Sequence, residues 1–207
     1  MIPRLFYITD GERGTAGRPL AQVVERAFEG GVEAVVVRER SLETGALVRL
    51  IDSLDASRQR GLRVLVSRRL DLARALGLDG VHLAADAVDV ATARGWLGAD
   101  AWIGYSAHSG PEAQRVAARG ADYVTLSPIR ATSSKPGACG RGTGWLRESL
   151  AGLPIPALAL GGVAAGDTDE ILRAGAWGVA AVSAIGAAPD VAAAASAFRK
   201  VLWENRS

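Results

Sequence analysis

The sequence has little cysteine, little lysine and no long apolar run, and each shortage excludes a class of protein. Its 207 residues include one cysteine, Cys139, which cannot form a disulfide within the chain and is typical of a reducing compartment. Glycine, proline or aspartate interrupts every apolar run before the roughly 18–20 residues of a membrane span. The first ten residues are typical of a strand and a turn rather than a secretion signal. We therefore expect a cytoplasmic protein with no membrane partner.

The chain also lacks a strong excess of charge of either sign. It carries 24 basic and 22 acidic residues, for a formal net charge of +2. A nucleic-acid-binding domain usually shows a clustered basic excess, so we expect no nucleic-acid partner. Only Lys135 and Lys200 are lysines, and arginine supplies all the other basic side chains.

One pattern recurs four times: a helix end, then a glycine, then a short apolar strand. It occurs in residues 28–38, 74–83, 117–126 and 172–182, and the glycine is typical of a helix C-cap. Four further apolar strands lie between these, at Leu5–Thr9, Arg63–Ser67, Trp102–Ser106 and Ala157–Leu160. Eight strands alternating with helices predict a single-domain (β/α)8 TIM barrel over residues 1–207. A doubly wound open sheet is the structural alternative, although the first turn lacks its glycine-rich signature.

Two helices carry more specific predictions. Residues Ser41–Arg58 predict one helix whose buried face carries Leu42, Ala46, Leu50 and Leu54. In the helix predicted at 167–174, Asp167 and Glu170 have the spacing of a capping box.

Small residues follow the last two predicted strands. Gly161 and Gly162 come after the first of them, and Ser183 and Ala184 come after the second. Glycine lets backbone N–H groups approach an anion closely, and the loops after strands seven and eight are the usual phosphate site of such a barrel. These four residues therefore predict a phosphate cup, which is the name we use for them below. The alternative is two tight turns that need small residues for packing.

Cationic and hydroxyl side chains follow most of the other strands. The candidate substrate-binding residues are Arg38, Arg40, Ser67, Arg68, His82, Ser106, Thr132, Ser134 and Lys135. The last three belong to Ser127–Gly144, a long segment after the sixth strand that we expect to lie over the barrel mouth. Because arginine and lysine bind phosphate oxygens, we expect an anionic substrate such as a phosphate ester. The alternative for individual arginines is pairing with Asp71, Asp79 or Asp86.

The two histidines are the side chains whose ordinary pKa lies near neutrality. His108 lies just past the fifth strand and is the candidate catalytic residue, whereas His82 lies within a strand and is more typical of a hydrogen-bonded core residue. No cluster of histidine, cysteine, aspartate and glutamate has metal-ligand spacing, so the sequence predicts neither a metal nor a cofactor.

Taken together, six segments resemble the thiamine phosphate synthase/TenI superfamily. They are residues 35–40, 67–87, 104–109, 121–137, 159–163 and 175–185, which occur in the same order and at the same spacing. The resemblance implies a (β/α)8 barrel, a thiazole phosphate bound at the ends of strands seven and eight, and a homodimer.

Departures from the superfamily pattern favour its TenI branch. The synthase pattern has glutamine and lysine where this chain has Val36 and Arg40, and asparagine where it has Ser67. Its two magnesium-binding aspartates fall on Arg68 and Ala87. The resemblance then implies a metal-independent thiazole tautomerase. Because the branch's usual histidine after strand six is replaced by Pro128, His108 is the candidate for the proton transfer.

Three alternatives stay open. The first is a thiamine phosphate synthase that joins pyrimidine pyrophosphate to thiazole phosphate, which we expect to be several powers of ten slower without the metal. The second is a non-catalytic protein that binds thiazole phosphate. The third is a sugar-phosphate epimerase, which would need histidine and aspartate metal ligands that the strand ends do not supply.

Overall fold

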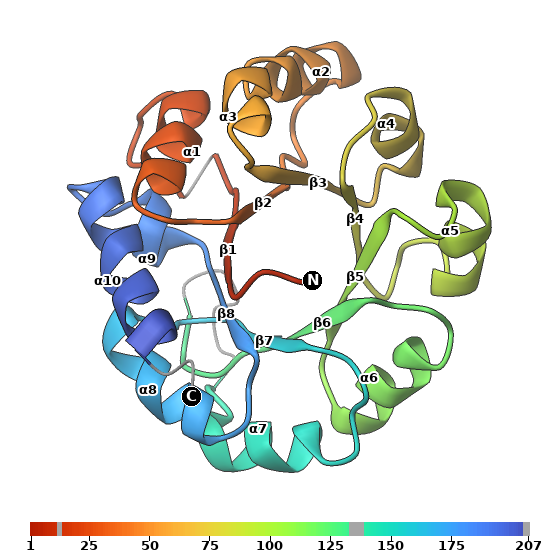
Figure 1. Cartoon of the computed structure of the whole chain (residues 1–207), viewed down its shortest axis with the longest axis vertical. Helices are drawn as coiled ribbons and strands as arrows, with labels where there is room; N and C mark the ends of the chain where they lie inside the picture. Colours follow the sequence, from red (N-terminus) through yellow and green to blue (C-terminus); the bar gives the residue numbers. More distant parts are fainter. Residues whose placement is uncertain (12–13, 133–138, 205–207) are drawn as a thin grey trace.

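Eight parallel strands form a closed barrel in a computed structural model that describes residues 1–11, 14–132 and 139–204 (Figure 1). The strands follow one another around the barrel in sequence order: β1 (Leu5–Ile8), β2 (Ala34–Val37), β3 (Arg63–Ser67), β4 (Gly80–Leu83), β5 (Trp102–Ala107), β6 (Tyr123–Leu126), β7 (Ala157–Ala159) and β8 (Gly178–Ala181). The predicted (β/α)8 fold is confirmed, and closure of the sheet excludes the doubly wound alternative.

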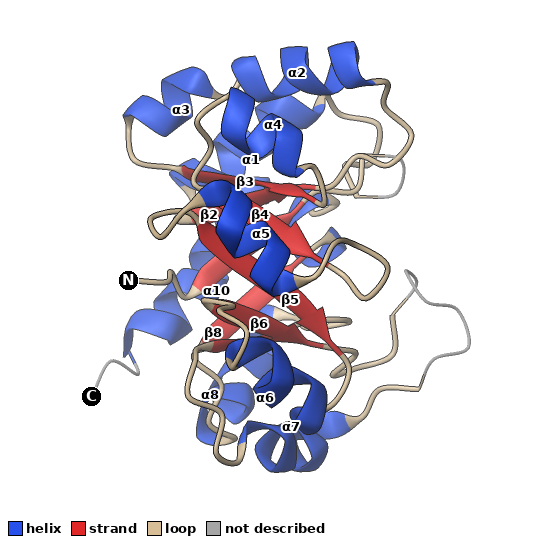
Figure 2. Ribbon diagram, turned by 90° about the vertical axis from the view of Figure 1, so that its right-hand side faces the viewer, coloured by secondary structure: helices blue, strands red, loops and turns tan. Residues whose placement is uncertain are grey.

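Helices surround the barrel on the outside (Figures 1 and 2). They are α1 (Leu20–Glu29), α2 (Thr44–Asp52), α3 (Asp55–Gln59), α4 (Leu70–Ala75), α5 (Val90–Leu97), α6 (Gly110–Ala117), α7 (Gly142–Leu150), the 3₁₀ turn η1 (Ala165–Asp167), α8 (Thr168–Arg173), α9 (Ser183–Gly186) and α10 (Val191–Glu204). In the part of the chain that the structure describes, none of them has both the length and the apolar character needed to cross a bilayer.

The four repeated glycines end their helices as the sequence predicts. Gly31, Gly77, Gly120 and Gly175 have φ angles of 107°, 55°, 98° and 101°. Glycine adopts this left-handed conformation without the steric cost that a Cβ would bring. Each glycine therefore reverses the chain from a helix into the strand that follows it.

Two predictions about helices are wrong. Residues 41–58 form two helices instead of one. Leu54 is buried as predicted, but Leu42 is 39% exposed, Ala46 and Leu50 are only half-buried, and Leu47 and Ile51 are buried instead. Leu42 precedes the first turn of α2, so it lies outside the helical periodicity that the sequence suggested. The break falls at Ser53, whose hydroxyl donates a hydrogen bond to the Leu50 carbonyl at 2.6 Å.

The predicted capping box between Asp167 and Glu170 is not formed. The Asp167 carboxylate accepts a hydrogen bond from the backbone N–H of Ala164 at 2.8 Å and from Arg130. Glu170 accepts hydrogen bonds from Arg130 and from the Thr143 hydroxyl. Both carboxylates thus connect α8 to the chain that surrounds it, rather than capping its own first turn.

The barrel interior is filled by one row of side chains from each strand. Inward-pointing residues include Phe6, Ile8, Ala34, Val36, Leu65, Tyr123, Leu158 and Ala180. In register, Gly104 lies between His82 on β4 and Tyr123 on β6. A Cβ at position 104 would lie 2.2 Å from Tyr123 Cζ and 2.5 Å from His82 Nδ1. The two rings therefore meet across the space that a side chain at 104 would fill.

We predict that Gly104→Ala lowers the free energy of unfolding by roughly 1–3 kcal/mol, because overpacking forces neighbouring side chains from their positions. The matched control is Gly95→Ala on α5, where a Cβ would meet nothing within 4 Å. Glycine inside a helix is less favourable than alanine, so this control should raise the free energy by roughly 0.5–1 kcal/mol. Urea unfolding measures both values. Equal stabilities for the two variants would contradict the packing described for Gly104.

Candidate active site

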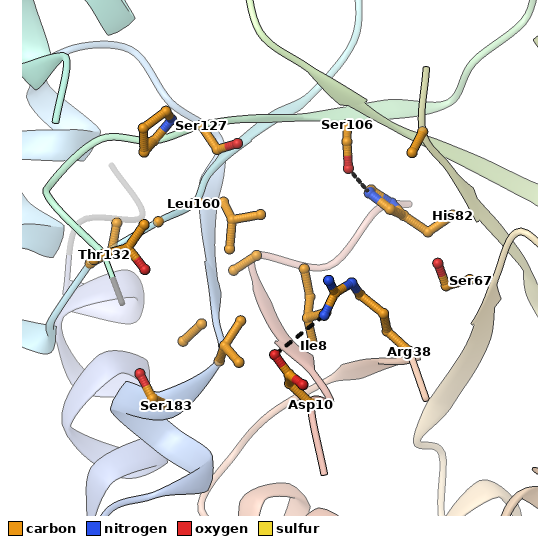
Figure 3. A pocket seen from close by; sticks show the side chains of 18 of the residues that line it. Ile8, Asp10, Arg38, Ser67, His82, Ser106, Ser127, Thr132, Leu160 and Ser183 are labelled. Carbon is orange, nitrogen blue, oxygen red and sulfur yellow. Dashed lines mark hydrogen bonds and ion pairs between the residues drawn. The ribbon is translucent and has the colours of Figure 1, made fainter. Parts of the chain in front are cut away.

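The carboxyl ends of the strands surround a cavity of about 490 Å³ (Figure 3). Its lining includes nearly all of the site residues that the sequence predicts: Arg38, Arg40, Ser67, Arg68, His82, Ser106, His108, Thr132, Gly161, Gly162, Ser183 and Ala184. Ser134 and Lys135 lie outside the described residues. The structure thus brings the candidates from seven strand ends to one cavity, and their roles remain predictions.

His82 is at the centre of a hydrogen-bond chain on the cavity floor. Its Nδ1 lies 3.0 Å from the Tyr123 hydroxyl. Its Nε2 lies 2.9 Å from the Ser106 hydroxyl, a contact that Figure 3 shows. The side chain is buried, yet it also lines the cavity. His82 is therefore both the hydrogen-bonded core residue that the sequence suggested and a residue within reach of a ligand.

The His82 imidazole is neutral near pH 7. Burial, and to a smaller extent the charge of Arg38, lowers the pKa of His82 from its ordinary value of 6.5 to about 4. A neutral imidazole has one donor and one acceptor, and a hydroxyl can supply either partner. Both hydrogen bonds are therefore satisfied without a buried positive charge.

Arg38 extends from the end of β2 into the cavity, and Asp10 faces it from the end of β1. Their Nη1 and Oδ2 atoms are 3.4 Å apart (Figure 3). The buried Thr9 fixes the backbone beside them, because its hydroxyl accepts a hydrogen bond from the Arg38 N–H at 2.9 Å and donates one to Glu39 at 2.5 Å. Burial raises the pKa of Glu39 above its ordinary value, although the hydrogen bonds from Thr9 and Gly11 oppose the shift.

Arg68 and Arg40 add two further positive charges on the same side of the cavity. Arg68 pairs with Asp86 through two contacts, of 2.6 Å and 2.5 Å. It has a φ of 65°, which is unusual for a residue other than glycine. The pKa of Arg40 is lowered chiefly by the charge of Arg38, with a further contribution from Arg68. Arg40 is therefore close enough to both Arg38 and Arg68 to be affected by their charges.

The alternative that arginines after the strands pair with aspartates is confirmed for Asp86 and Asp71, whereas the partner of Asp79 is Arg63 at the start of β3, which was not one of those arginines. Asp86 pairs with Arg68, Asp71 with Arg69, and Asp79 with Arg63. Only the first pair lines the cavity. Sequence reasoning missed Asp10, although it directly follows the first strand and the rule that placed the other candidates would have found it.

All four residues of the phosphate cup line the cavity, and Figure 3 shows one of them, Ser183, across the cavity from Arg38. Gly161 and Gly162 follow β7 with φ angles of 93° and 66°, and Ser183 and Ala184 begin α9. Among the residues that the structure describes, no group accepts a hydrogen bond from the backbone N–H of any of these four residues. The four N–H groups are therefore available to an anion.

His108 lines the cavity from the end of β5. Its Nδ1 lies 3.2 Å from the Ser127 carbonyl oxygen. A carbonyl can only accept, so Nδ1 carries the proton in this contact and Nε2 is left without one in the neutral ring. The carbonyl oxygen of His108 itself accepts a hydrogen bond from Arg141 at 2.6 Å. His108 thus contacts the segment that follows β6 at two points, Ser127 at its start and Arg141 near its end.

A family model described as thiamine monophosphate synthase matches residues 5–185. The chain belongs to the thiamine monophosphate synthase family. A thiamine-phosphate synthase from Azorhizobium caulinodans is 38% identical, with 98% of this chain and 96% of that protein covered. A thiamine-phosphate synthase from Methanoregula boonei is 39% identical, with 95% of this chain and 91% of that protein covered.

A solved structure described as thiamine phosphate pyrophosphorylase from Pyrococcus furiosus is similar over the whole barrel. It superposes with a TM-score of 0.88 at 29% identity and covers 99% of this chain and 97% of that one. The similarity to proteins of the thiamine monophosphate synthase family therefore extends over the strands, the helices and the loops that form the cavity.

The names of these similar proteins contradict the tautomerase interpretation. The relatives are named thiamine-phosphate synthases and the structural neighbour is a pyrophosphorylase, so they agree with the alternative instead. The prediction of a TenI-type tautomerase is therefore wrong, whereas a catalytic role for His108 stays a prediction. The tautomerase prediction relied on Arg68 and Ala87, two positions whose side chains differ from the synthase pattern, whereas the similarity covers nearly the whole chain.

The magnesium ion that the family resemblance implies does not fit the residues of this cavity. Mg²⁺ is usually held by carboxylate oxygens together with substrate phosphates. Asp10 and Asp86 line the cavity, but Arg38 and Arg68 already pair with them. Within the described ranges, no group of three or more histidine, cysteine, aspartate or glutamate side chains could hold a metal ion. The cavity offers guanidinium groups where a metal would need carboxylates.

We predict that the neutral state of His82 makes folding stability depend on pH. Between about pH 6.5 and pH 4 the unfolded chain binds a proton at His82 that the folded chain does not, so the free energy of unfolding falls as pH falls. The full loss is roughly 3 kcal/mol. In His82→Gln this contribution should be missing, and the difference in stability between parent and variant should shrink as the pH is lowered.

Urea unfolding at a series of pH values checks this prediction. Other titrating groups, including Glu39, are common to both chains and cancel in the difference between them. A difference in stability that does not change between pH 6.5 and pH 4 would show that His82 binds protons equally well in the folded and unfolded states.

Proposed function

We propose that this chain joins a pyrimidine carrying a methylene diphosphate to a thiazole phosphate, and so acts as a thiamine-phosphate synthase. The observation that carries the proposal is a single cavity with two sides suited to anions. Arg38, Arg40 and Arg68 lie on one side, and the backbone N–H groups of the phosphate cup lie on the other. Two phosphorylated substrates need two such sides in one cavity. The names of the family and of the relatives agree with this reaction.

The wall between the two sides is apolar. Ile8, Leu160 and Ala180 line the cavity there, and Figure 3 shows Ile8 and Leu160 between the arginine side and Ser183. Flat aromatic rings are favoured against such a surface because their burial removes apolar area from water. The thiazole and pyrimidine rings would therefore meet over this wall, with their phosphate groups directed to opposite sides.

The reaction exchanges one bond for another. The bond between the pyrimidine methylene carbon and the diphosphate oxygen breaks, and its electron pair leaves with the diphosphate. The lone pair of the thiazole nitrogen then forms the new carbon–nitrogen bond. Negative charge develops on the leaving oxygen, and preorganised guanidinium groups stabilise such charge in a cavity that excludes water. Holding both substrates in one cavity also removes the entropic cost of bringing them together.

His82 and Ser106 suit the centre of this site. Positive charge develops on the methylene carbon as the diphosphate leaves, and the neutral His82 imidazole does not oppose it. A protonated histidine at the same place would raise the barrier by electrostatic repulsion. In this proposal His108 is a positioning residue, because it holds the carbonyl oxygen of Ser127 at the start of the segment after β6.

We predict that the purified protein forms thiamine phosphate and diphosphate from pyrimidine methylene diphosphate and thiazole phosphate. Arg38→Gln should lower kcat/KM by at least tenfold, since it removes a cation from the leaving-group side of the cavity. The control is Arg69→Gln, because Arg69 pairs with Asp71 and does not line the cavity. Product analysis by chromatography measures the rate. Binding of both substrates without any product would refute a synthase activity.

We further predict that Ser183→Asp raises the KM for thiazole phosphate at least tenfold, because a carboxylate would repel the phosphate in the cup. Ser183 is exposed, and aspartate is favourable in the first turn of a helix, so folding should be retained. Ala193→Asp is the matched control: it adds the same charge to the first turn of the neighbouring α10, and Ala193 does not line the cavity. Steady-state kinetics distinguish them. An unchanged KM in Ser183→Asp would place the phosphate elsewhere.

A further inference from the structure

The arginine side of the cavity carries an excess of positive charge. Arg38 and Arg40 lie at the end of β2, and Arg68 follows β3. Among the described residues, Asp10 and Asp86 are the carboxylates that line the same side of the cavity, so two negative charges face three positive ones there. The charge of Arg38, then burial and the charge of Arg68, lower the pKa of Arg40, while Asp86 and Asp10 only partly oppose the shift.

We infer that Arg38, Arg40 and Arg68 hold the diphosphate directly, without a divalent cation, and that Asp10 and Asp86 occupy Arg38 and Arg68 until the diphosphate displaces them. The inference rests on the proposed function for the identity of the anion. It goes beyond that function in assigning a metal-free site and in giving the two aspartates an opposing role.

The contacts of Arg68 show how such an exchange would work. Two of its nitrogens contact the two carboxylate oxygens of Asp86, and the same planar fork fits two oxygens of a phosphate group. The Asp86 side chain is 67% exposed, so water can solvate the carboxylate once it is released. Arg68 Nε is buried and has no hydrogen-bond partner among the described residues, which leaves a further donor unsatisfied.

The pair between Arg38 and Asp10 is the looser of the two. Its atoms are 3.4 Å apart, longer than the 2.5 Å contact of Arg68 with Asp86. Arg38 is also the cation that acts on both His82 and Arg40, so its charge extends over the floor and the rim of the cavity. A diphosphate carries several negative charges and can replace both aspartates at once.

An arginine site and a metal site predict opposite effects of the same substitution. If Asp86 competes with the diphosphate for Arg68, then Asp86→Asn removes the competitor and should tighten diphosphate binding at least threefold. If Asp86 instead helps to hold Mg²⁺, the same variant loses a metal ligand and should bind diphosphate more weakly. The substitution is nearly isosteric and exposed, so folding should be unaffected.

The experiment is calorimetric titration of inorganic diphosphate into the full chain, once with a chelator and once with excess Mg²⁺. We expect binding in chelator, no tightening with Mg²⁺, and tighter binding by Asp86→Asn. Binding that needs Mg²⁺, binding that tightens tenfold with it, or weaker binding by Asp86→Asn would each overturn the inference.

Arg68→Asn tests the arginine itself. Asparagine tolerates a φ of 65° better than arginine does, so the variant should stay folded, and its affinity for diphosphate in chelator should fall at least tenfold. Arg69→Asn is the matched control at the next residue, whose side chain contacts Asp71 and Thr44 outside the cavity. Equal affinities for the two variants, with both folded by thermal unfolding, would remove Arg68 from the site.

These titrations do not depend on turnover. Diphosphate binding in chelator without thiamine phosphate synthesis would leave the arginine site standing and refute the proposed function. Thiamine phosphate synthesis together with Mg²⁺-dependent diphosphate binding would support the function and refute the arginine site.

Discussion

The cavity depends on a neutral imidazole held beneath a group of cations. His82 is buried between Tyr123 and Ser106, and its low pKa keeps it uncharged while Arg38 lies nearby. A charged histidine there would add a buried cation to a place that already has an excess of them. The hydrogen-bond chain therefore does two things: it joins β4, β5 and β6 at the floor, and it leaves the positive charge of the cavity to the rim, where an anion can reach it.

Much of the barrel could be predicted from the sequence because buried parallel strands are apolar over their whole length. A second rule is that parallel strands end at the same face of the sheet. It predicted that the four residues of the phosphate cup would lie together. The prediction of the buried face of α2 was wrong because Leu42 lies before the helix begins. Where a helix starts depends on tertiary contacts that the periodicity of the sequence does not report. The strand-end rule would have found Asp10, but its pair with Arg38 joins residues that are distant in the sequence and become neighbours only when β1 pairs with β2.

The function was harder to predict from the sequence than the fold, for an electrostatic reason. Arg68 and Ala87 stand where the resemblance called for metal-binding carboxylates, and this was taken as the loss of a reaction. A leaving diphosphate needs compensating positive charge, and a guanidinium can supply such charge as well as a metal can. Replacing a metal-binding aspartate by arginine therefore does not by itself exclude a reaction in which diphosphate leaves. Similarity over the whole chain is the stronger guide to the reaction.

Gly104 has a consequence for how this barrel can change over generations. The Tyr123 phenol and the His82 ring fill the space next to the Gly104 Cα, since a Cβ there would lie 2.2 Å from the first and 2.5 Å from the second. While both rings are kept, any side chain at 104 costs stability, and replacing Tyr123 by a small side chain removes only one of the two conflicts because His82 Nδ1 stays 2.5 Å from the Cβ. Positions 82, 104 and 123 lie on three neighbouring strands, so a side chain gained at 104 must be matched by volume lost at both of the others.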